Sequence, residues 1–124
     1  MLQLSEHFRL NEFTRSITAE RFKIANSPDA LSIRNLRYLC LRVLEPIRKQ
    51  FGHPIHVNSG YRCEKLNTLV HGAHSSFHLS GRAADITASD FPLLCDTVQR
   101  LVHEDVIHPR EIIYHDSYIH IAYV

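Results

Sequence analysis

The residue types that could perform chemistry gather in one short stretch, HSSFHLSGRAADI, which spans residues 74–86. It places His78 seven residues before Asp85, with Gly81 between them. An ionised carboxylate flanked by Ala84 and Ile86 is costly to bury unless it is paired or bound to a metal. Gly81 permits a sharp turn that lets both side chains face one point. The stretch therefore predicts either a histidine–aspartate hydrogen bond or part of a metal site.

A second histidine, His120, could join this pair from near the end of the chain. It lies between Ile119 and Ile121, so strand alternation points its ring to the face opposite the two isoleucines. If that strand pairs with the strand carrying Asp85, His120 faces the same pocket. Two imidazoles and one carboxylate form the ligand set of a catalytic zinc with an open fourth position. Spacing alone leaves the hydrogen-bonded pair and the metal site as alternatives.

The elements that must position these residues begin with a long helix. Apolar residues recur at helical spacing over residues 36–47. Asp29 or Ser32 could cap the start of this helix, and Gly52 could end it. Pro46 predicts a kink, because it cannot donate to the carbonyl four residues earlier.

From residue 54 onward the pattern favours short strands with helices between them. The predicted elements are a strand that turns at Ser59–Gly60, a short helix over 63–70, a strand over 82–87, a helix capped by Asp90, and strands over 111–115 and 118–124 that a tight turn at Asp116–Ser117 joins. Helices followed by a small sheet with an inserted helix predict an α+β fold. The length favours one domain over residues 1–124.

Composition excludes several classes of function. The chain has 124 residues, a formal net charge of +1 and no block of basic residues, so we expect no nucleic-acid partner. No apolar stretch reaches the roughly 20 residues that span a bilayer, and no signal peptide is visible. We therefore expect synthesis in the cytoplasm. Three cysteines without a CxxC motif predict neither a disulfide framework nor a cysteine-based zinc site.

Three segments together resemble the zinc D-Ala-D-Ala carboxypeptidase family of murein peptidases. They are SGYRCEKLN, HGAHSSFHLSGRAADI and YIHIAYV. The hallmark S-x-H-x-x-G-x-A-x-D of that family is matched by Ser76, His78, Gly81, Ala83 and Asp85. The opening LSEHFRLNEFTRS is similar to small, single-domain phage and prophage members, whose relatives include D-Ala-D-Ala dipeptidases and L-alanyl-D-glutamate endolysins. The resemblance implies a Hedgehog-like fold, with a helical N-terminal part packed on a small, mainly antiparallel sheet.

The same resemblance implies roles for individual residues. It makes His78, Asp85 and His120 the ligands of a zinc ion. It makes Arg62 the residue that contacts the substrate and stabilises the developing oxyanion, a task for which a fixed guanidinium is suited. Ser76 matches a polar position that either contacts the substrate or braces a ligand. Asn67, another recurrent polar position, is expected to hold a turn.

The general base departs from the family pattern. Better-known members carry a glutamate or histidine two or three residues before the last zinc ligand, where this chain has Tyr118 and Ser117. The nearest candidates for moving the proton are His115 and Asp116, with His74 as a third. Each has a simpler interpretation, as a strand-end, turn or loop residue respectively.

Three functions follow as hypotheses. The leading one is a zinc metallopeptidase that cuts the peptide stems of peptidoglycan, at D-Ala-D-Ala or L-Ala-D-Glu bonds, after release or export to the cell wall. The second is a degenerate module that keeps zinc and binds wall peptides without cutting them. The third is a structural or phage-particle protein that has kept only the fold. For the leading hypothesis we expect a monomer whose partner is the peptide stem.

Overall fold

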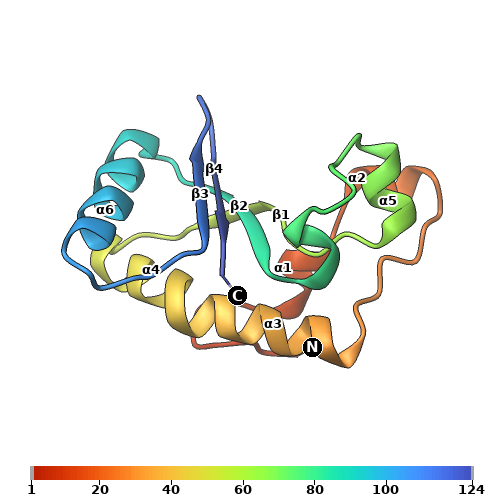
Figure 1. Cartoon of the computed structure of the whole chain (residues 1–124), viewed down its shortest axis with the longest axis horizontal. Coiled ribbons are helices and arrows are strands. Elements are labelled where there is room, and N and C mark those ends of the chain that lie inside the picture. The colour runs from red at the N-terminus through yellow and green to blue at the C-terminus, as the bar shows by residue number, and fades with distance from the viewer. Residues whose placement is uncertain (1, 124) are drawn as a thin grey trace.

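The structure is a computed structural model that describes residues 2–123 (Figure 1). Its helical segments are α1 (Leu10–Thr14), α2 (Ile17–Arg21), α3 (Ala30–Leu39), a π-helical turn (Cys40–Leu44), α4 (Glu45–Phe51), α5 (Glu64–Leu69), a 3-10 turn (Phe77–Ser80) and α6 (Phe91–His103). Its strands are β1 (His56–Ser59), β2 (Ala83–Thr87), β3 (Glu111–Tyr114) and β4 (Ile119–Ala122). The predicted α+β class is confirmed.

The four strands form one antiparallel sheet in the order β1-β2-β4-β3. The last two strands are a hairpin, closed by a hydrogen bond of 2.9 Å from the His115 N–H to the Tyr118 carbonyl. The predicted turn at Asp116–Ser117 lies inside it. The hairpin is also tied to β2, because the Thr87 hydroxyl donates to the Ser117 carbonyl at 2.9 Å. The central pairing of β2 with β4 fulfils the condition on which the sequence argument for His120 depended.

The long helix predicted over residues 36–47 is present, with an unexpected turn in the middle. Asp29, one of the two expected caps, accepts a hydrogen bond from the Ser32 N–H. Gly52 ends the helix in the left-handed region, with φ at +79°. Ahead of Pro46 the helix widens into the π-helical turn, in which the Glu45 N–H bonds to the Cys40 carbonyl five residues back. Pro46 then stands in the first turn of α4, where its missing N–H costs little.

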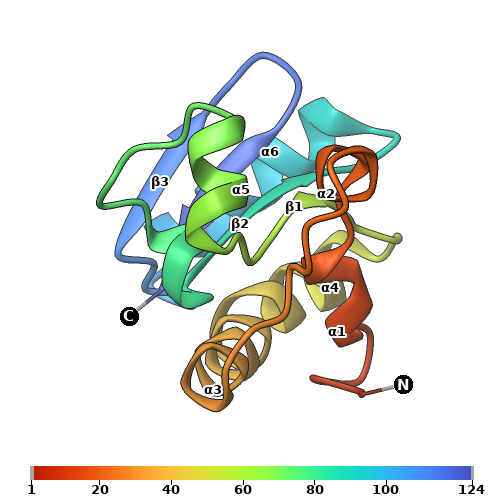
Figure 2. The same ribbon diagram turned by 90° about the vertical axis from the view of Figure 1, so that its right-hand side faces the viewer.

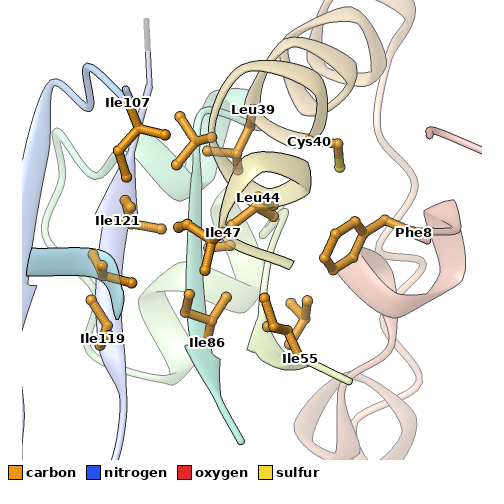
Figure 3. Close-up of a cluster of buried hydrophobic side chains, with 14 of the residues drawn as sticks. Phe8, Leu39, Cys40, Leu44, Ile47, Ile55, Ile86, Ile107, Ile119 and Ile121 are labelled. Carbon is orange, nitrogen blue, oxygen red and sulfur yellow. The ribbon is translucent and has the colours of Figure 1, made fainter. Parts of the chain in front are cut away.

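The hydrophobic core lies between this helix and one face of the sheet. Figure 3 shows Leu39, Leu44 and Ile47 of the helix facing Ile86 of β2 and Ile121 of β4. All five side chains are fully buried. On the other flank, α6 packs against α4 and covers the β3–β4 end of the sheet (Figure 1). Because strand side chains alternate, burying these apolar residues on one face sends Asp85 and His120 to the other.

The N-terminal segment contains two short helices, α1 and α2, that the sequence analysis did not locate. Phe13 of α1 is fully buried, and its carbonyl accepts from the Tyr61 N–H at 2.7 Å, just beyond β1. Figure 2 shows α2 and α5 on either side of β1. The start of the chain is fastened to α4, where Glu45 accepts from the Ser5 hydroxyl and the His7 N–H. Within residues 2–123, no helix is long and apolar enough to cross a membrane.

Candidate metal centre

Two of the three predicted metal ligands face each other across the middle of the sheet. Asp85 of β2 and His120 of β4 are direct partners in the antiparallel register. Nδ1 of His120 lies 3.0 Å from Oδ1 of Asp85. Both side chains are largely buried, with exposed fractions of 14% for His120 and 17% for Asp85.

The third, His78, reaches the same point from the 3-10 turn that precedes β2. Its ring is 2% exposed, and its Nε2 lies 3.2 Å from the same Oδ1 of Asp85. Gly81 makes this approach possible, because its φ of +72° turns the chain sharply into β2. A Cβ at this position would also lie 2.4 Å from the Ser32 carbonyl oxygen of α3. The glycine of the sequence pattern is therefore required by both conformation and space.

The outward nitrogen of each histidine is held by an acceptor. Nδ1 of His78 lies 2.6 Å from the Gly60 carbonyl oxygen, and Nε2 of His120 lies 2.7 Å from Oε1 of Glu111. A carbonyl and a carboxylate can only accept, so each of these nitrogens carries a hydrogen. In the neutral rings, the lone pairs of the other two nitrogens then point towards Asp85.

This arrangement fits a divalent metal such as zinc. Two imidazole lone pairs and a carboxylate oxygen repel one another unless a positive charge, either protons or a metal ion, lies between them. The three ligand atoms lie within 4.8 Å of one another. Ligands at the usual zinc distances of about 2.0–2.2 Å in a tetrahedron are roughly 3.3–3.5 Å apart, close to the separations from Asp85. Acceptors behind both histidines are also the usual surroundings of metal ligands.

The protonation equilibria of the cluster agree with a site that attracts positive charge. Burial alone would raise the pKa of Asp85, but the hydrogen bonds that His120 and His78 donate when their rings are protonated outweigh it and hold that pKa well below its ordinary value. The hydrogen bond to Asp85 raises the pKa of His120, against the opposing effect of burial. Asp85 is therefore ionised at neutral pH.

Arg62 lies beside this cluster, as the resemblance implied. Burial lowers the pKa of its guanidinium, while the nearby Asp85 and Tyr118 act in the opposite direction. Within residues 2–123 its buried Nε has no hydrogen-bond partner. A buried donor left unpaired costs free energy of about 1–3 kcal/mol, so the group is well suited to receive an acceptor from a bound ligand.

An amide that the sequence analysis overlooked fixes the backbone on both sides of Arg62. The Asn26 side chain donates to the Tyr61 carbonyl at 2.9 Å, and its oxygen accepts from the Cys63 N–H at 2.8 Å. The Arg62 N–H itself donates to the His78 carbonyl at 3.1 Å. No local pattern marks Asn26, because its partners Thr14, Tyr61 and Cys63 lie at least twelve residues away in the chain.

Two further polar residues of the pattern support the loops around the cluster. The Ser76 hydroxyl oxygen accepts from the His78 N–H at 3.1 Å and caps the 3-10 turn, which braces a predicted ligand. Asn67 is buried in α5, and its Nδ2 donates to the Ala73 carbonyl at 3.0 Å. That bond holds the turn after α5, as expected for Asn67.

The candidates for moving a proton are all exposed. Among residues 2–123, neither His115 nor Asp116 forms a side-chain hydrogen bond with the cluster, and His74 lies in the exposed loop before the 3-10 turn. The ring of His115 stacks on Tyr118, with centroids 4.3 Å apart. Tyr118 is in turn one of the groups that influence the pKa of Arg62.

A pocket of about 590 Å³ opens beside the cluster, between α2 and α5. Asp85 and Arg62 line it together with all four residues of β1. Its lining includes the apolar Ile17 and Val70 and the charged Arg15 and Glu20. The site therefore combines a cation-binding cluster, a half-buried guanidinium and room for an extended ligand.

The comparisons with known proteins agree with this geometry. The model of the family described as Peptidase M15 matches residues 6–122, which is nearly the whole chain. The chain belongs to the Peptidase M15 family. The resemblance to zinc D-Ala-D-Ala carboxypeptidases is thereby confirmed, because these enzymes form the M15 family. No curated protein matches the chain.

Membership of the M15 family places the chain among zinc metallopeptidases, whose substrates are peptides. The match includes the stretch that carries His78 and Asp85 and the strand that carries His120. The three side chains brought together by the fold are thus a chemically suitable zinc site in a zinc-dependent family.

Glu111 is a second residue near the site that the sequence analysis missed, although a signal was present. A two-residue turn at Asp116–Ser117 fixes the hairpin register and sets Ile113 opposite His120. Glu111 lies two residues before Ile113, so strand alternation puts it on the same face as His120. The register of this hairpin follows from the predicted turn, so the sequence alone could have placed Glu111 beside His120.

Proposed function

We propose that this protein is a zinc-dependent peptidase that hydrolyses bonds in the peptide stems of peptidoglycan, of the D-Ala-D-Ala or L-Ala-D-Glu type. The observation that carries the proposal is the convergence of His78 Nε2, His120 Nδ1 and Asp85 Oδ1 beside the half-buried guanidinium of Arg62. The M15 match supports the peptidase chemistry. The peptidoglycan substrate rests on the resemblance to murein peptidases.

In this proposal His78, Asp85 and His120 hold the zinc ion. Bound zinc supplies a water molecule of lowered pKa and polarises the scissile carbonyl. The protein supplies a rigid site, because Gly60 and Glu111 orient the two imidazoles before the metal arrives. A preformed site avoids reorganisation during the reaction.

Arg62 binds the substrate and stabilises the negative charge that develops on the carbonyl oxygen. Its guanidinium is permanently charged. Its buried Nε has no partner among residues 2–123, so it can donate to the substrate without breaking an existing hydrogen bond. Asn26 keeps the Arg62 backbone in place from both sides. The guanidinium is therefore positioned before the substrate arrives, which is the condition for effective transition-state stabilisation.

His115 is the best-placed of the candidates for the proton transfer. Histidine is the side chain that most often both takes and returns a proton in catalysis. The His115 ring stacks on Tyr118, which lies close enough to Arg62 to affect the pKa of the guanidinium. Asp116 keeps the role of the alternative.

The pocket between α2 and α5 accommodates the peptide. Its volume of about 590 Å³ is within the range of ligand pockets, roughly 300–1,000 Å³. The edge strand β1 lines it with four consecutive residues, so an extended peptide can lie along this strand. Arg15 in its lining provides a positive charge for the carboxylates that such stems carry.

Mass spectrometry of purified muropeptides tests the proposal. The zinc-loaded protein and its Asp85→Ala variant are incubated separately with the same muropeptides. We expect a product of lower mass with the wild type and none with the variant, and the mass lost identifies the bond. If the zinc-loaded wild type leaves every muropeptide intact, the hydrolytic proposal is wrong.

The exposed positions of His115 and Asp116 favour one alternative, a zinc-containing module that binds wall peptides without cutting them. Titration calorimetry with the same muropeptides distinguishes the two. Binding that depends on Asp85 but yields no product supports the module. The third hypothesis, a particle protein that keeps only the fold, predicts neither binding nor bound zinc.

A further inference from the structure

We propose that Glu111 is a positioning residue that holds His120 in the tautomer needed to bind zinc, and thereby sets the affinity of the site for the metal. This inference rests on the proposed zinc site. It concerns a residue outside the ligand pattern, on the edge strand β3.

The contact that carries the inference joins Oε1 of Glu111 to Nε2 of His120 at 2.7 Å. The carboxylate can only accept, so it selects the form of His120 with hydrogen on Nε2. Nδ1 is then the nitrogen left for the metal. It lies 3.0 Å from Oδ1 of Asp85, so any hydrogen that it donates to Asp85 in the metal-free protein is displaced when Zn²⁺ binds. In the other tautomer a hydrogen on Nδ1 occupies the direction that a metal requires.

His78 shows the same arrangement with the two nitrogens exchanged. Its Nδ1 donates to the Gly60 carbonyl, which leaves Nε2 for the metal. That acceptor belongs to the backbone and is present in every variant that folds. His120 instead depends on a side chain that is 42% exposed, so its tautomer can be changed by one substitution.

The position of Glu111 excludes it as the general base. Its carboxylate binds the nitrogen of His120 that points away from Asp85, so it lies behind the ligand ring. A base must reach the water on the metal side of that ring. The contribution of Glu111 is therefore to orientation and to the basicity of the imidazole.

The test compares the affinity for Zn²⁺ alone of four proteins, by competition with a chromophoric chelator at pH 7.5. They are the wild type, Glu111→Ala, Glu111→Gln and the control Glu104→Ala. Glu104 is exposed, and among the described residues its side chain forms no hydrogen bond. Thermal unfolding of the metal-free proteins verifies that each variant folds.

We expect Glu111→Ala to bind Zn²⁺ about 10- to 100-fold more weakly than the wild type, and Glu104→Ala to bind it equally well. Glu111→Gln retains an acceptor oxygen without the charge, so its loss is smaller than that of the alanine variant. Long-range ¹H–¹⁵N correlations of the imidazole in the zinc-loaded protein report which nitrogen carries the hydrogen. We expect hydrogen on Nε2 of His120 in the wild type, with Nδ1 on the metal.

Zn²⁺ affinity within twofold of the wild type in Glu111→Ala, or a zinc-loaded wild type in which Nε2 of His120 carries no hydrogen, overturns the inference. The ligand variant Asp85→Ala separates this from failure of the zinc site. If Asp85→Ala loses Zn²⁺ and Glu111→Ala does not, only the role of Glu111 is wrong. If the wild type binds no Zn²⁺, or Asp85→Ala binds it as the wild type does, the proposed site itself is wrong.

Discussion

At the scale of single residues, the site depends on which atoms are left without a partner. The cluster of His78, Asp85 and His120 points two lone pairs at one carboxylate, and only a positive charge makes that arrangement favourable. Arg62 adds a buried donor, Nε, that has no acceptor among residues 2–123. Such unpaired groups destabilise the free protein, and a ligand that supplies their missing partners removes this cost when it binds.

Substitution of Arg62 should separate catalysis from metal binding. We expect Arg62→Gln to lower kcat/KM by about 10²–10³-fold, because the charge that faces the developing oxyanion is lost. Zn²⁺ affinity should stay within threefold of the wild type, since Arg62 is not among the proposed ligands. Steady-state kinetics on the muropeptide that the wild type cuts, with Arg100→Gln as the exposed control, measures this. An unchanged kcat/KM would remove Arg62 from the mechanism.

Paired substitutions at the hairpin turn decide which side chain moves the proton. We expect His115→Gln to reduce kcat by about 10²–10⁴-fold and Asp116→Asn to reduce it by less than threefold. The two residues are adjacent and both exposed, so each variant serves as the control for the other. The reverse order of effects would assign the proton transfer to Asp116.

At the scale of elements, the site is assembled by turns more than by strands. The 3-10 turn and the left-handed Gly81 bring His78 back over β2, and the hairpin turn sets the register of β3 and β4. At the other end of the molecule, Glu45 of α4 fastens the N-terminal segment through Ser5 and His7. We call these three places, where one segment is joined to the next by a turn or by hydrogen bonds, junctions. Each of them depends on one or two residues.

Alanine at Gly81 should disturb the fold more than alanine at Gly52. Both glycines have a positive φ, so each substitution costs about 1–2 kcal/mol of conformational energy. A Cβ at Gly52 meets nothing within 4 Å, whereas one at Gly81 lies 2.4 Å from the Ser32 carbonyl oxygen. We therefore expect a larger loss of unfolding free energy in Gly81→Ala, measured by urea denaturation. Equal losses would show that the turn relaxes without cost.

The Glu45 junction predicts a specific dependence of stability on pH. Burial raises the pKa of Glu45, but hydrogen bonds from Ser5 and His7 outweigh it, so its folded pKa lies below the ordinary value. A lowered folded pKa contributes stability above the unfolded pKa, near pH 4.5, which is lost as pH falls through the folded pKa.

We expect Glu45→Gln to be less stable than the wild type by about 1–3 kcal/mol at pH 7, and this difference to shrink below about pH 4.5. Urea denaturation at pH 7, 5, 4 and 3 measures it, with the exposed Glu104→Gln as the control. A difference that stays constant down to pH 3 would contradict the assignment.

At the scale of the whole molecule, the core and the site share one sheet. The apolar side chains of β2 and β4 hold the sheet to the long helix, and their neighbours in the sequence carry Asp85 and His120 on the opposite face. Metal binding and folding are therefore coupled through the same strands. A ligand that binds only the folded state stabilises it by mass action.

Removal of metal should lower the melting temperature of the whole molecule. At free Zn²⁺ near one hundred times its Kd, binding contributes about 2.7 kcal/mol, which corresponds to roughly 10 °C for a chain of this size. Thermal scans with Zn²⁺ and with excess chelator measure the shift. Asp85→Ala should show no difference between the two conditions. The same shift in that variant would place the metal elsewhere.

The local pattern of apolar and capping residues in the sequence was sufficient to predict most of the helices and strands. Alternation of apolar residues located the strands, helical spacing located the long helix, and Asp29 and Gly52 marked its ends. The positions of α1 and α2 were not predicted, because five-residue helices carry too few turns for a periodic signal. The π-helical turn before Pro46 was also missed, since a proline predicts a disturbance in a helix without specifying its form.

The sequence by itself determined the side chains available for chemistry and, through alternation, the face on which Asp85 and His120 lie. It left open whether His120 meets Asp85, because pairing between distant strands is a long-range choice. The tertiary structure decided that point by pairing β2 with β4. It alone also decided the contacts of Gly60 and Asn26, because a hydrogen bond between distant segments depends on where the whole chain places both partners.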